Sequence, residues 1–118
     1  MPKLAESKCE ACRLGAEPVT TTEERELLEA IPNWSVIQDG SPSRLQRAFR
    51  FTNFLKALEF SCRVGEIAEA EDHHPSLLTE WGRVTVTWWT HKIKGLHKND
   101  FIMAAKTDQL YERFVDDH

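Results

Sequence analysis

The sequence predicts an α+β domain in which a four-stranded antiparallel sheet carries three helices packed on one face. Alternating polarity, typical of half-buried strands, occurs at 44–51 and 83–91, and shorter candidate strands lie at 34–37 and 77–79. Helical patterns precede, separate and follow these two pairs of strands. No strand–helix–strand pattern of the kind that builds parallel sheets appears beyond the central helix, which favours an antiparallel sheet with its helices on one side.

Composition limits the chain to one domain. Its 118 residues and 41% hydrophobic content suffice for one core. The net charge is −4, whereas a nucleic-acid surface normally shows a basic stripe, so we expect no nucleic-acid partner. No apolar run reaches the length of about 18 residues that suggests a membrane span, and the first residues lack the apolar core of a secretory signal. We therefore expect a cytoplasmic protein with no membrane segment, divided into a polar N-terminal tail (1–20) and a domain (21–115).

The tail contains a C-x-x-C pair formed by Cys9 and Cys12. A structural zinc site typically needs four ligands, no second pair follows, and Cys62 alone does not complete a site. A thioredoxin-like redox motif would follow a strand, and no strand pattern precedes the pair. We favour two reduced, unpaired cysteines, with a metal shared between subunits as the open alternative.

A first helix is predicted to begin at a capping box, Thr21-x-x-Glu24, and to run to about Ala30 before Pro32 stops it. Its apolar side consists of Leu27, Leu28 and Ile31. The strands at 34–37 and 44–51 follow, joined through an Asp39-Gly40 turn, and should form an antiparallel hairpin. In the second strand one face carries Leu45, Arg47, Phe49 and Phe51.

The central helix is predicted from a cap at Thr52 or Asn53 to about Ala70. Its apolar residues form two stripes, so the apolar sector is wide for a helix in a small domain. One stripe can pack on the sheet while the other meets a second helix or another subunit. The first stripe contains Leu55, Leu58 and Cys62, and the second contains Phe60, Val64, Ile67 and Ala68.

A third strand at 77–79, a turn at Trp81-Gly82 and a fourth strand at 83–91 complete the predicted sheet. Side chains alternate along the fourth strand, so His91 should end it on the face opposite to Val84, Val86 and Trp88. A last helix should begin near Asn99 or Asp100. Its apolar positions are Met103, Thr107, Leu110 and Phe114.

Candidate chemistry concentrates in the stretch Glu69-x-x-x-His73-His74-Pro75 and at His91. Histidine has an unperturbed pKa of about 6.5, so it can give or take a proton near neutral pH, and the following proline restricts the backbone. This concentration indicates proton-transfer chemistry. A metal site is the competing interpretation, with Glu69, Asp72, His73 and His91 as ligands if they converge.

Seven positions within 32 residues carry a resemblance to a known family: Glu69, His73, His74, Pro75, Trp81, His91 and Asp100. This pattern resembles that of the pterin-4a-carbinolamine dehydratases, also called 4a-hydroxytetrahydrobiopterin dehydratases or dimerization cofactors of a homeodomain transcription factor. The resemblance extends more loosely from about Thr20 to Phe114. It implies a four-stranded sheet with three helices, assembled as a homodimer or homotetramer.

The resemblance implies a lyase that eliminates water from 4a-hydroxytetrahydrobiopterin to give quinonoid dihydropterin in tetrahydrobiopterin recycling. No metal or other cofactor is implied. His73 and His91 would be the acid–base pair, and His74 would assist or bind substrate. The implied substrate-binding residues are Glu69, Pro75, Trp89 and Asp100. Pro75 would act by locking its loop, Asp100 fits a helix cap as well as a direct role, and Trp81 is expected to pack at the turn.

Two positions depart from the family pattern. Asn99 stands where relatives often carry arginine, which removes any role of that guanidinium in closing the site. His97 stands where relatives often carry serine or threonine. We expect His97 to be a solvent-exposed substitute cap, with an extra ligand near the site as the alternative.

Two other functions compete with the dehydratase. Relatives stabilise dimers of a transcription factor through a helical surface, and the apolar sector at 54–68 could serve as such a protein-binding module. We favour a homo-oligomer through this sector because the catalytic set is intact. The third possibility is an enzyme acting on another pterin, such as one linked to molybdopterin.

Overall fold

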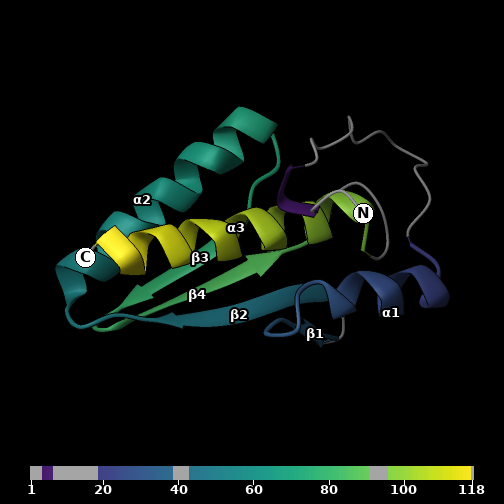
Figure 1. The fold of residues 1–118 in the computed structure, drawn as a ribbon, viewed down its shortest axis with the longest axis horizontal. Helices are drawn as coiled ribbons and strands as arrows, with labels where there is room; N and C mark the ends of the chain where they lie inside the picture. The colour runs from purple at the N-terminus through teal and green to yellow at the C-terminus, as the bar shows by residue number, and fades with distance from the viewer. Residues whose placement is uncertain (1–3, 7–18, 39–42, 91–95, 118) are drawn as a thin grey trace.

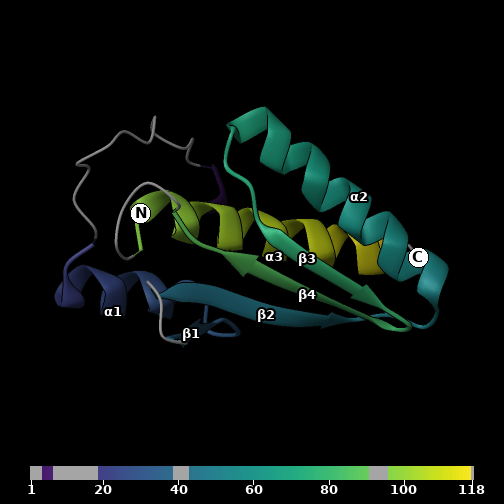
Figure 2. The same ribbon diagram turned by 180° about the vertical axis from the view of Figure 1, so that it is seen from behind.

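The computed structural model describes residues 4–6, 19–38, 43–90 and 96–117 of the chain. A four-stranded antiparallel sheet forms one layer, and helices cover one of its faces (Figures 1 and 2). The predicted α+β class is therefore confirmed. The elements in chain order are η1 (Leu4–Glu6), α1 (Thr21–Glu29), β1 (Ser35–Ile37), β2 (Arg44–Arg50), α2 (Phe54–Glu71), β3 (Ser76–Glu80), β4 (Arg83–Trp88) and α3 (Lys98–Asp117).

The sheet has the order β1-β2-β4-β3, so the two predicted hairpins lie side by side. Strands β2 and β4 form its centre, where Leu45 pairs with Trp88 and Phe49 with Val84. In the β3–β4 turn Gly82 has a φ of 71°, and a Cβ there would lie 3.1 Å from the Phe51 carbonyl oxygen. Glycine is needed at this turn because a side chain would meet both a strained backbone and a close contact.

Trp81 in the same turn corrects a prediction. Its side chain is 75% exposed, so within this chain it does not pack as a turn anchor. The two-residue turn directs it outward, away from the core.

The core lies between the sheet and the helices α2 and α3. Val84, Val86 and Trp88 all point into it, as the alternation in β4 predicts, and Leu45 and Phe49 join them from β2. Each such side chain contributes roughly 1.5–3 kcal/mol when fully buried. Trp88 therefore holds a fixed position at the end of β4.

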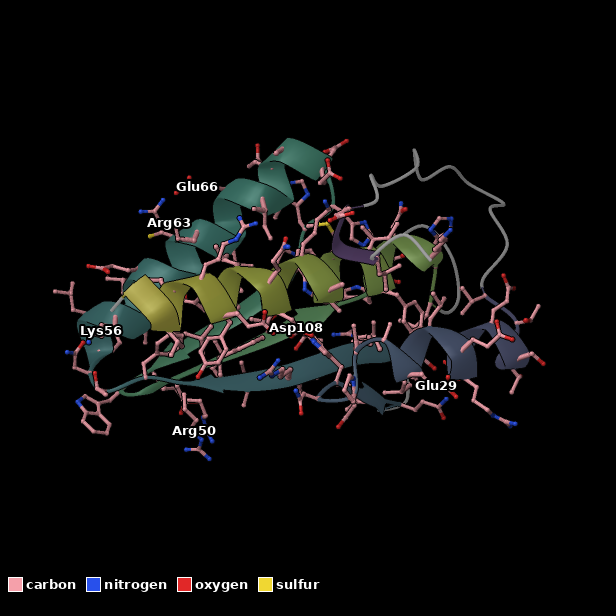
Figure 3. All side chains as sticks on the ribbon, viewed as in Figure 1. Glu29, Arg50, Lys56, Arg63, Glu66 and Asp108 are labelled. Carbon is pink, nitrogen blue, oxygen red and sulfur yellow. The ribbon has the colours of Figure 1, made fainter. Side chains whose placement is uncertain are left out.

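Helix α2 starts after Asn53, whose side chain accepts a hydrogen bond from the Lys56 backbone N–H. Its stripe of Phe60, Val64 and Ala68 is buried against the core. The other predicted stripe faces outward, with Leu55 63% and Leu58 43% exposed. Arg63 and Glu66 also project from the outward side of α2 (Figure 3).

The capping box of α1 lies one residue earlier than predicted. Thr20 and Glu23 form that box, with Thr20 N–H donating to the Glu23 carboxylate and Glu23 N–H donating to the Thr20 hydroxyl. The preceding Val19 donates its N–H to the Leu96 carbonyl oxygen at 2.8 Å. The start of α1 is thereby tied to the segment that leads into α3.

Several predictions fall partly or wholly outside the described residues. These include the turn at Asp39-Gly40, the pair Cys9 and Cys12, and His91. Strand β4 itself ends at Trp88, three residues before the predicted end. Of the tail, Leu4–Glu6 forms a short 3₁₀ turn that lies against α3, and Leu4 packs against the core. Within the described ranges, no helix is long and apolar enough to cross a membrane.

Candidate active site

His73 is positioned by the way α2 ends. Asp72 adopts a left-handed conformation with φ 50° and ψ 43°, which Asp tolerates better than most residues. The N–H groups of Asp72 and His73 then donate to carbonyl oxygens of the last turns, including that of Ala68. This helix end turns the chain so that the His73 side chain is buried beside the sheet.

The His73 imidazole meets Asp100, which lies in the first turn of α3. His73 Nε2 and Asp100 Oδ1 are 2.7 Å apart, and both side chains are buried. The imidazole also stacks on Trp88, with ring centroids 5.8 Å apart and planes 10° apart. The end of α2, the end of β4 and the start of α3 therefore converge on one imidazole.

Asp100 is held by donors on its other oxygen. Oδ2 accepts hydrogen bonds from the Thr90 hydroxyl at 2.8 Å and from the His97 backbone N–H at 2.9 Å. The second of these bonds caps the start of α3, as proposed from the sequence. Because both oxygens are engaged, the carboxylate has a defined orientation.

His97 is the cap residue of α3, but it is not exposed. Its Nδ1 accepts the backbone N–H of Asn99 at 3.0 Å, in the manner of a serine or threonine cap. The side chain is only 9% exposed, which corrects the expectation of a solvent-exposed cap. The ring is large enough to be covered by its surroundings while one nitrogen reaches the helix end. Asn99 is likewise buried.

His74 points to a different environment. Its Nε2 lies 2.5 Å from Glu69 Oε1, and the two side chains are 51% and 79% exposed. Adjacent residues on an extended loop diverge, which explains why His73 is buried and His74 is open. Glu69 therefore orients an accessible imidazole.

The remaining predicted site residues are less closely grouped. Pro75 is half-buried and directly precedes β3. Trp89 is half-buried, and the Arg44 guanidinium lies 4.3 Å from the centre of its ring. His91 lies outside the described residues. Of the predicted set, the structure brings together His73 with Asp100 and His74 with Glu69.

Two residues that contact the His73–Asp100 pair, Trp88 and Thr90, were not identified from the sequence. Trp88 appeared only as a core residue, and Thr90 was not considered. The sequence nevertheless indicates both residues, because side chains two positions apart near the end of a strand point to the same side of the chain. Trp88 and Thr90 are spaced in this way immediately before His91.

The metal interpretation finds no support in the part of the chain that is described. Among those residues, no three His, Cys, Asp or Glu side chains come together in a group that could hold an ion. The four ligands considered from the sequence include His91, so that set extends beyond the described residues.

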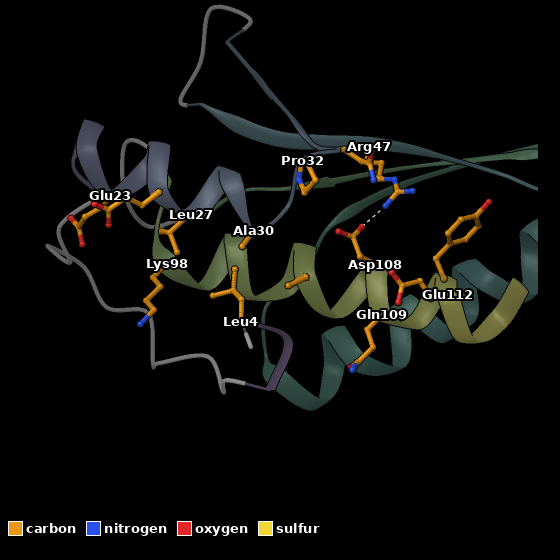
Figure 4. A pocket seen from close by; sticks show the side chains of 14 residues that line it. Leu4, Glu23, Leu27, Ala30, Pro32, Arg47, Lys98, Asp108, Gln109 and Glu112 are labelled. Atoms are coloured by element: carbon orange, nitrogen blue, oxygen red, sulfur yellow. Dashed lines mark hydrogen bonds and ion pairs between the residues drawn. The ribbon is translucent and has the colours of Figure 1, made fainter. Parts of the chain in front are cut away.

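A separate cavity of about 780 Å³ lies between α1 and α3 (Figure 4). None of the predicted site residues lines it. At its edge Asp108 Oδ1 accepts hydrogen bonds from Arg47 at 2.6 Å and from the Trp34 indole at 2.7 Å. Burial raises the pKa of Asp108 above its usual value, and the hydrogen bonds and charge of its partners oppose this effect only in part. No histidine is among the described residues that line this cavity, so they form no carboxylate–imidazole pair like that of His73 with Asp100.

A buried carboxylate bonded to an imidazole is a recurring device in proton transfer. The carboxylate holds the ring in one orientation and one tautomer, and it balances the charge that appears when the ring takes a proton. The His73–Asp100 pair has the distance and burial for this role, so the arrangement suits general acid or general base catalysis.

Comparison with known proteins identifies the family. Residues 17–110 match the family described as pterin 4 alpha carbinolamine dehydratase. Two relatives carry the provisional name pterin-4-alpha-carbinolamine dehydratase. The relative from Nitrosococcus oceani is 57% identical over 110 residues, which cover 93% of this chain and 97% of the relative. The relative from Syntrophotalea carbinolica is 54% identical over 112 residues, covering 95% and 100%.

A solved structure agrees with these relatives. The crystal structure of a transcriptional coactivator/pterin dehydratase from Brucella melitensis has a TM-score of 0.73 and 33% sequence identity, and the match covers 80% of this chain and 99% of that one. Fold, sequence pattern and relatives agree, and the chain belongs to the pterin 4 alpha carbinolamine dehydratase family.

Proposed function

We propose that the chain removes water from 4a-hydroxytetrahydrobiopterin by histidine acid–base catalysis and thereby serves tetrahydrobiopterin recycling. The observation that carries this proposal is the buried contact between His73 and Asp100 in a chain of this family. A carboxylate–imidazole pair of this kind suits proton transfer to or from a bound substrate.

The reaction needs two proton transfers. The C4a–O bond breaks as the hydroxyl receives a proton and leaves as water. The N5 electron pair forms the C4a–N5 double bond, and the N5 proton passes to a base. One general acid and one general base suffice, each typically contributing roughly 10²–10⁴-fold to the rate. The proposed reaction therefore requires neither a metal nor a redox cofactor.

We assign one of these transfers to His73 and the other to His91. Asp100 supports His73 by orienting its ring and balancing its charge, which is a positioning role. The assignment of His91 rests on its place in the sequence pattern. His74, oriented by Glu69, is assigned to substrate binding or to assisting the transfer, because its exposed imidazole is accessible to a ligand.

Pro75 and Trp89 are the remaining residues that we propose contribute to substrate binding. Pro75 restricts the loop that carries both histidines. Trp89 already has one ring contact with Arg44, so its indole is held in place as a surface on which a flat pterin can stack.

A dehydration assay with a synthetic 4a-hydroxytetrahydropterin tests the proposal. The purified protein should accelerate loss of water well above the spontaneous rate, and prior treatment with a chelator should leave the rate unchanged. No acceleration would contradict the proposed activity, and a chelator-sensitive rate would contradict the metal-free mechanism. Replacing the biopterin side chain with that of other pterins in the same assay tests the alternative of a different pterin substrate.

A protein-binding function is the second candidate, and one surface favours it. The outward stripe of α2 exposes Leu55 and Leu58, and exposed apolar groups of this kind often mark an interface. The Brucella melitensis protein is described as both a coactivator and a pterin dehydratase. We propose that this stripe chiefly builds a homodimer or homotetramer, with a different protein partner as the alternative.

The same proposal extends to organisation and location. We take 21–115 as the catalytic domain of a cytoplasmic enzyme, with 1–20 as a tail that catalysis does not require. Activity of a fragment without the tail is the measurement that tests this division.

A further inference from the structure

The Asp100 carboxylate uses its two oxygens for two separate tasks. Oδ1 meets His73 Nε2 at 2.7 Å, whereas Oδ2 accepts the Thr90 hydroxyl at 2.8 Å and the His97 backbone N–H at 2.9 Å. The carboxylate is fully buried, so water does not replace a lost partner without a rearrangement. The donors on Oδ2 therefore decide which way Oδ1 points.

Thr90 supplies a side-chain hydroxyl donor to Oδ2 of Asp100. It is buried and lies two residues beyond Trp88, the residue that stacks on His73. The segment that leaves β4 thus supports the imidazole twice, directly through the Trp88 ring and indirectly through the Thr90 hydroxyl. The two supports meet at the proposed catalytic histidine from different directions.

We propose that Thr90 is a positioning residue for proton transfer at His73. Its hydroxyl holds Asp100 so that Oδ1 accepts a hydrogen bond from Nε2–H, which fixes the imidazole in the Nε2-protonated tautomer. This inference rests on the proposed dehydration but concerns a residue outside the sequence pattern that identifies the family.

The side-chain hydroxyl, rather than the shape of Thr90, is the required feature. An ionised carboxylate only accepts hydrogen bonds, so the hydroxyl must donate to it. With valine at this position the volume is kept and the hydroxyl donor to Oδ2 is lost. The carboxylate can then rotate, and Oδ1 no longer holds a fixed place opposite His73.

The kinetic test compares Thr90→Val with Thr90→Ser. We expect Thr90→Val to lower kcat by about 10- to 100-fold, the rate equivalent of one lost hydrogen bond to a charged group, with little change in KM. Thr90→Ser keeps the donor and should stay close to the parent. The matched control is Thr79→Val on β3, where Thr79 pairs with Val84 at the far end of β4. It removes the 2.6 Å hydroxyl contact between Thr79 and Ser61 of α2. This control should retain the parental kcat.

A second readout does not require turnover. The ¹⁵N chemical shifts of the His73 ring, assigned by comparison with His73→Ala, report its tautomer. The parent and Thr90→Ser should show protonation at Nε2, and Thr90→Val should show a mixture of tautomers. If Thr90→Val does not fold, Thr90→Ala replaces it in both measurements, with Thr90→Ser as its reference.

The outcomes separate this inference from the proposed function. A parent protein without dehydratase activity would overturn the function, while the tautomer comparison would still test Thr90. A folded Thr90→Val with parental kcat and an unchanged His73 tautomer would overturn the positioning role. A rise in KM alone would also overturn it, and so would a Thr90→Ser protein as impaired as Thr90→Val.

Discussion

At the scale of single residues, the neighbouring histidines 73 and 74 have different surroundings. His73 is buried against Trp88 and paired with Asp100, while His74 is open and paired with Glu69. A buried, oriented imidazole suits proton transfer, and an exposed one suits contact with a ligand. The consecutive positions in the sequence therefore lead to distinct expectations for mutation.

His73→Ala and Asp100→Asn should each lower kcat/KM by roughly 10²–10⁴-fold, since the first removes a proton carrier and the second the group that orients it. His91→Ala should have a similar effect, and the loss in the double variant of His73 and His91 should be smaller than the product of the two single losses. Steady-state kinetics on variants shown to be folded by circular dichroism provide the measurement.

His74→Ala serves as the comparison within the same loop. It should chiefly raise KM, as expected when binding common to substrate and transition state is lost. Near-normal turnover by a folded His73→Ala protein would remove His73 from the mechanism.

Asp108 gives a prediction on stability and pH. Burial raises the pKa of this carboxyl in the folded protein above its ordinary value of 3.8, despite hydrogen bonds from Trp34 and Arg47. The folded state then binds the proton more tightly than the unfolded state. The stabilisation from this group is fully present below pH 3.8 and is lost as the pH rises through the raised pKa.

Urea denaturation of the parent and of Asp108→Asn, carried out from below pH 3.8 to above the raised pKa of Asp108, measures this change in stability. The difference in unfolding free energy, parent minus variant, should fall as the pH increases, because asparagine does not titrate. The Trp34 indole N–H resonance should titrate with the same midpoint. A difference that grows with pH would show that the Arg47 ion pair outweighs burial.

At the scale of elements, the start of α3 contributes both to the stability of the helix and to the candidate site. Asp100 receives the His97 N–H as a helix cap and meets His73 as a candidate catalytic partner. The same carboxylate thus links helix formation to the site, and His97 Nδ1 satisfies a second N–H of the helix.

Replacing the cap residue should affect stability more than chemistry. His97→Ala loses the acceptor for the Asn99 N–H and should destabilise the protein by about 1 kcal/mol, the typical cost of losing a helix cap. His97→Ser keeps a side-chain oxygen that can accept the Asn99 N–H and should recover most of this loss. Thermal denaturation measures both variants, and kcat should change little. A large loss of kcat in a stable His97→Ala protein would instead indicate a direct role in the site.

At the scale of the whole molecule, α2 separates an inward from an outward stripe. Val64 is fully buried, whereas Leu55 and Leu58 are exposed. The structure therefore decides which of the two predicted stripes packs on the sheet and which is left for another subunit. We predict a dimer or larger assembly at micromolar concentration, formed through the outward stripe.

Leu58→Asp should split this assembly into folded subunits, while Val64→Asp should unfold the subunit because a charge enters the core. Multi-angle light scattering and circular dichroism distinguish the two results. A parent protein that is monomeric under these conditions would contradict the predicted assembly.

The tail gives a separate prediction for the whole chain. Deleting residues 1–16 should retain the fold and the dehydratase activity, since the proposed catalytic residues lie elsewhere. Stability should fall by about 1 kcal/mol, because Leu4 packs against the core and half-buried leucine contributes part of its full burial energy. If the deletion removed both the activity and a stoichiometric amount of bound zinc, Cys9 and Cys12 would form a shared metal site.

The sequence by itself determined the fold class, the order of the elements and most element boundaries to within one or two residues. These properties follow from local signals, such as the alternation that buries Val84 and Val86, the turn at Gly82 and the cap at Asn53. Local periodicity specifies which face of each element is apolar. The seven-residue pattern in turn predicted the family, which the comparisons confirm.

Only the tertiary structure decided which side chains meet. The contact of His73 with Asp100 joins residues 27 positions apart, and the stacking on Trp88 and the bond from Thr90 depend on how three elements converge. Likewise the burial of His97, the exposure of Trp81 and the outward direction of Leu55 depend on which neighbours cover each position. Periodicity assigns a residue to a face of its own element, but a contact or a burial is set by the second element that packs there.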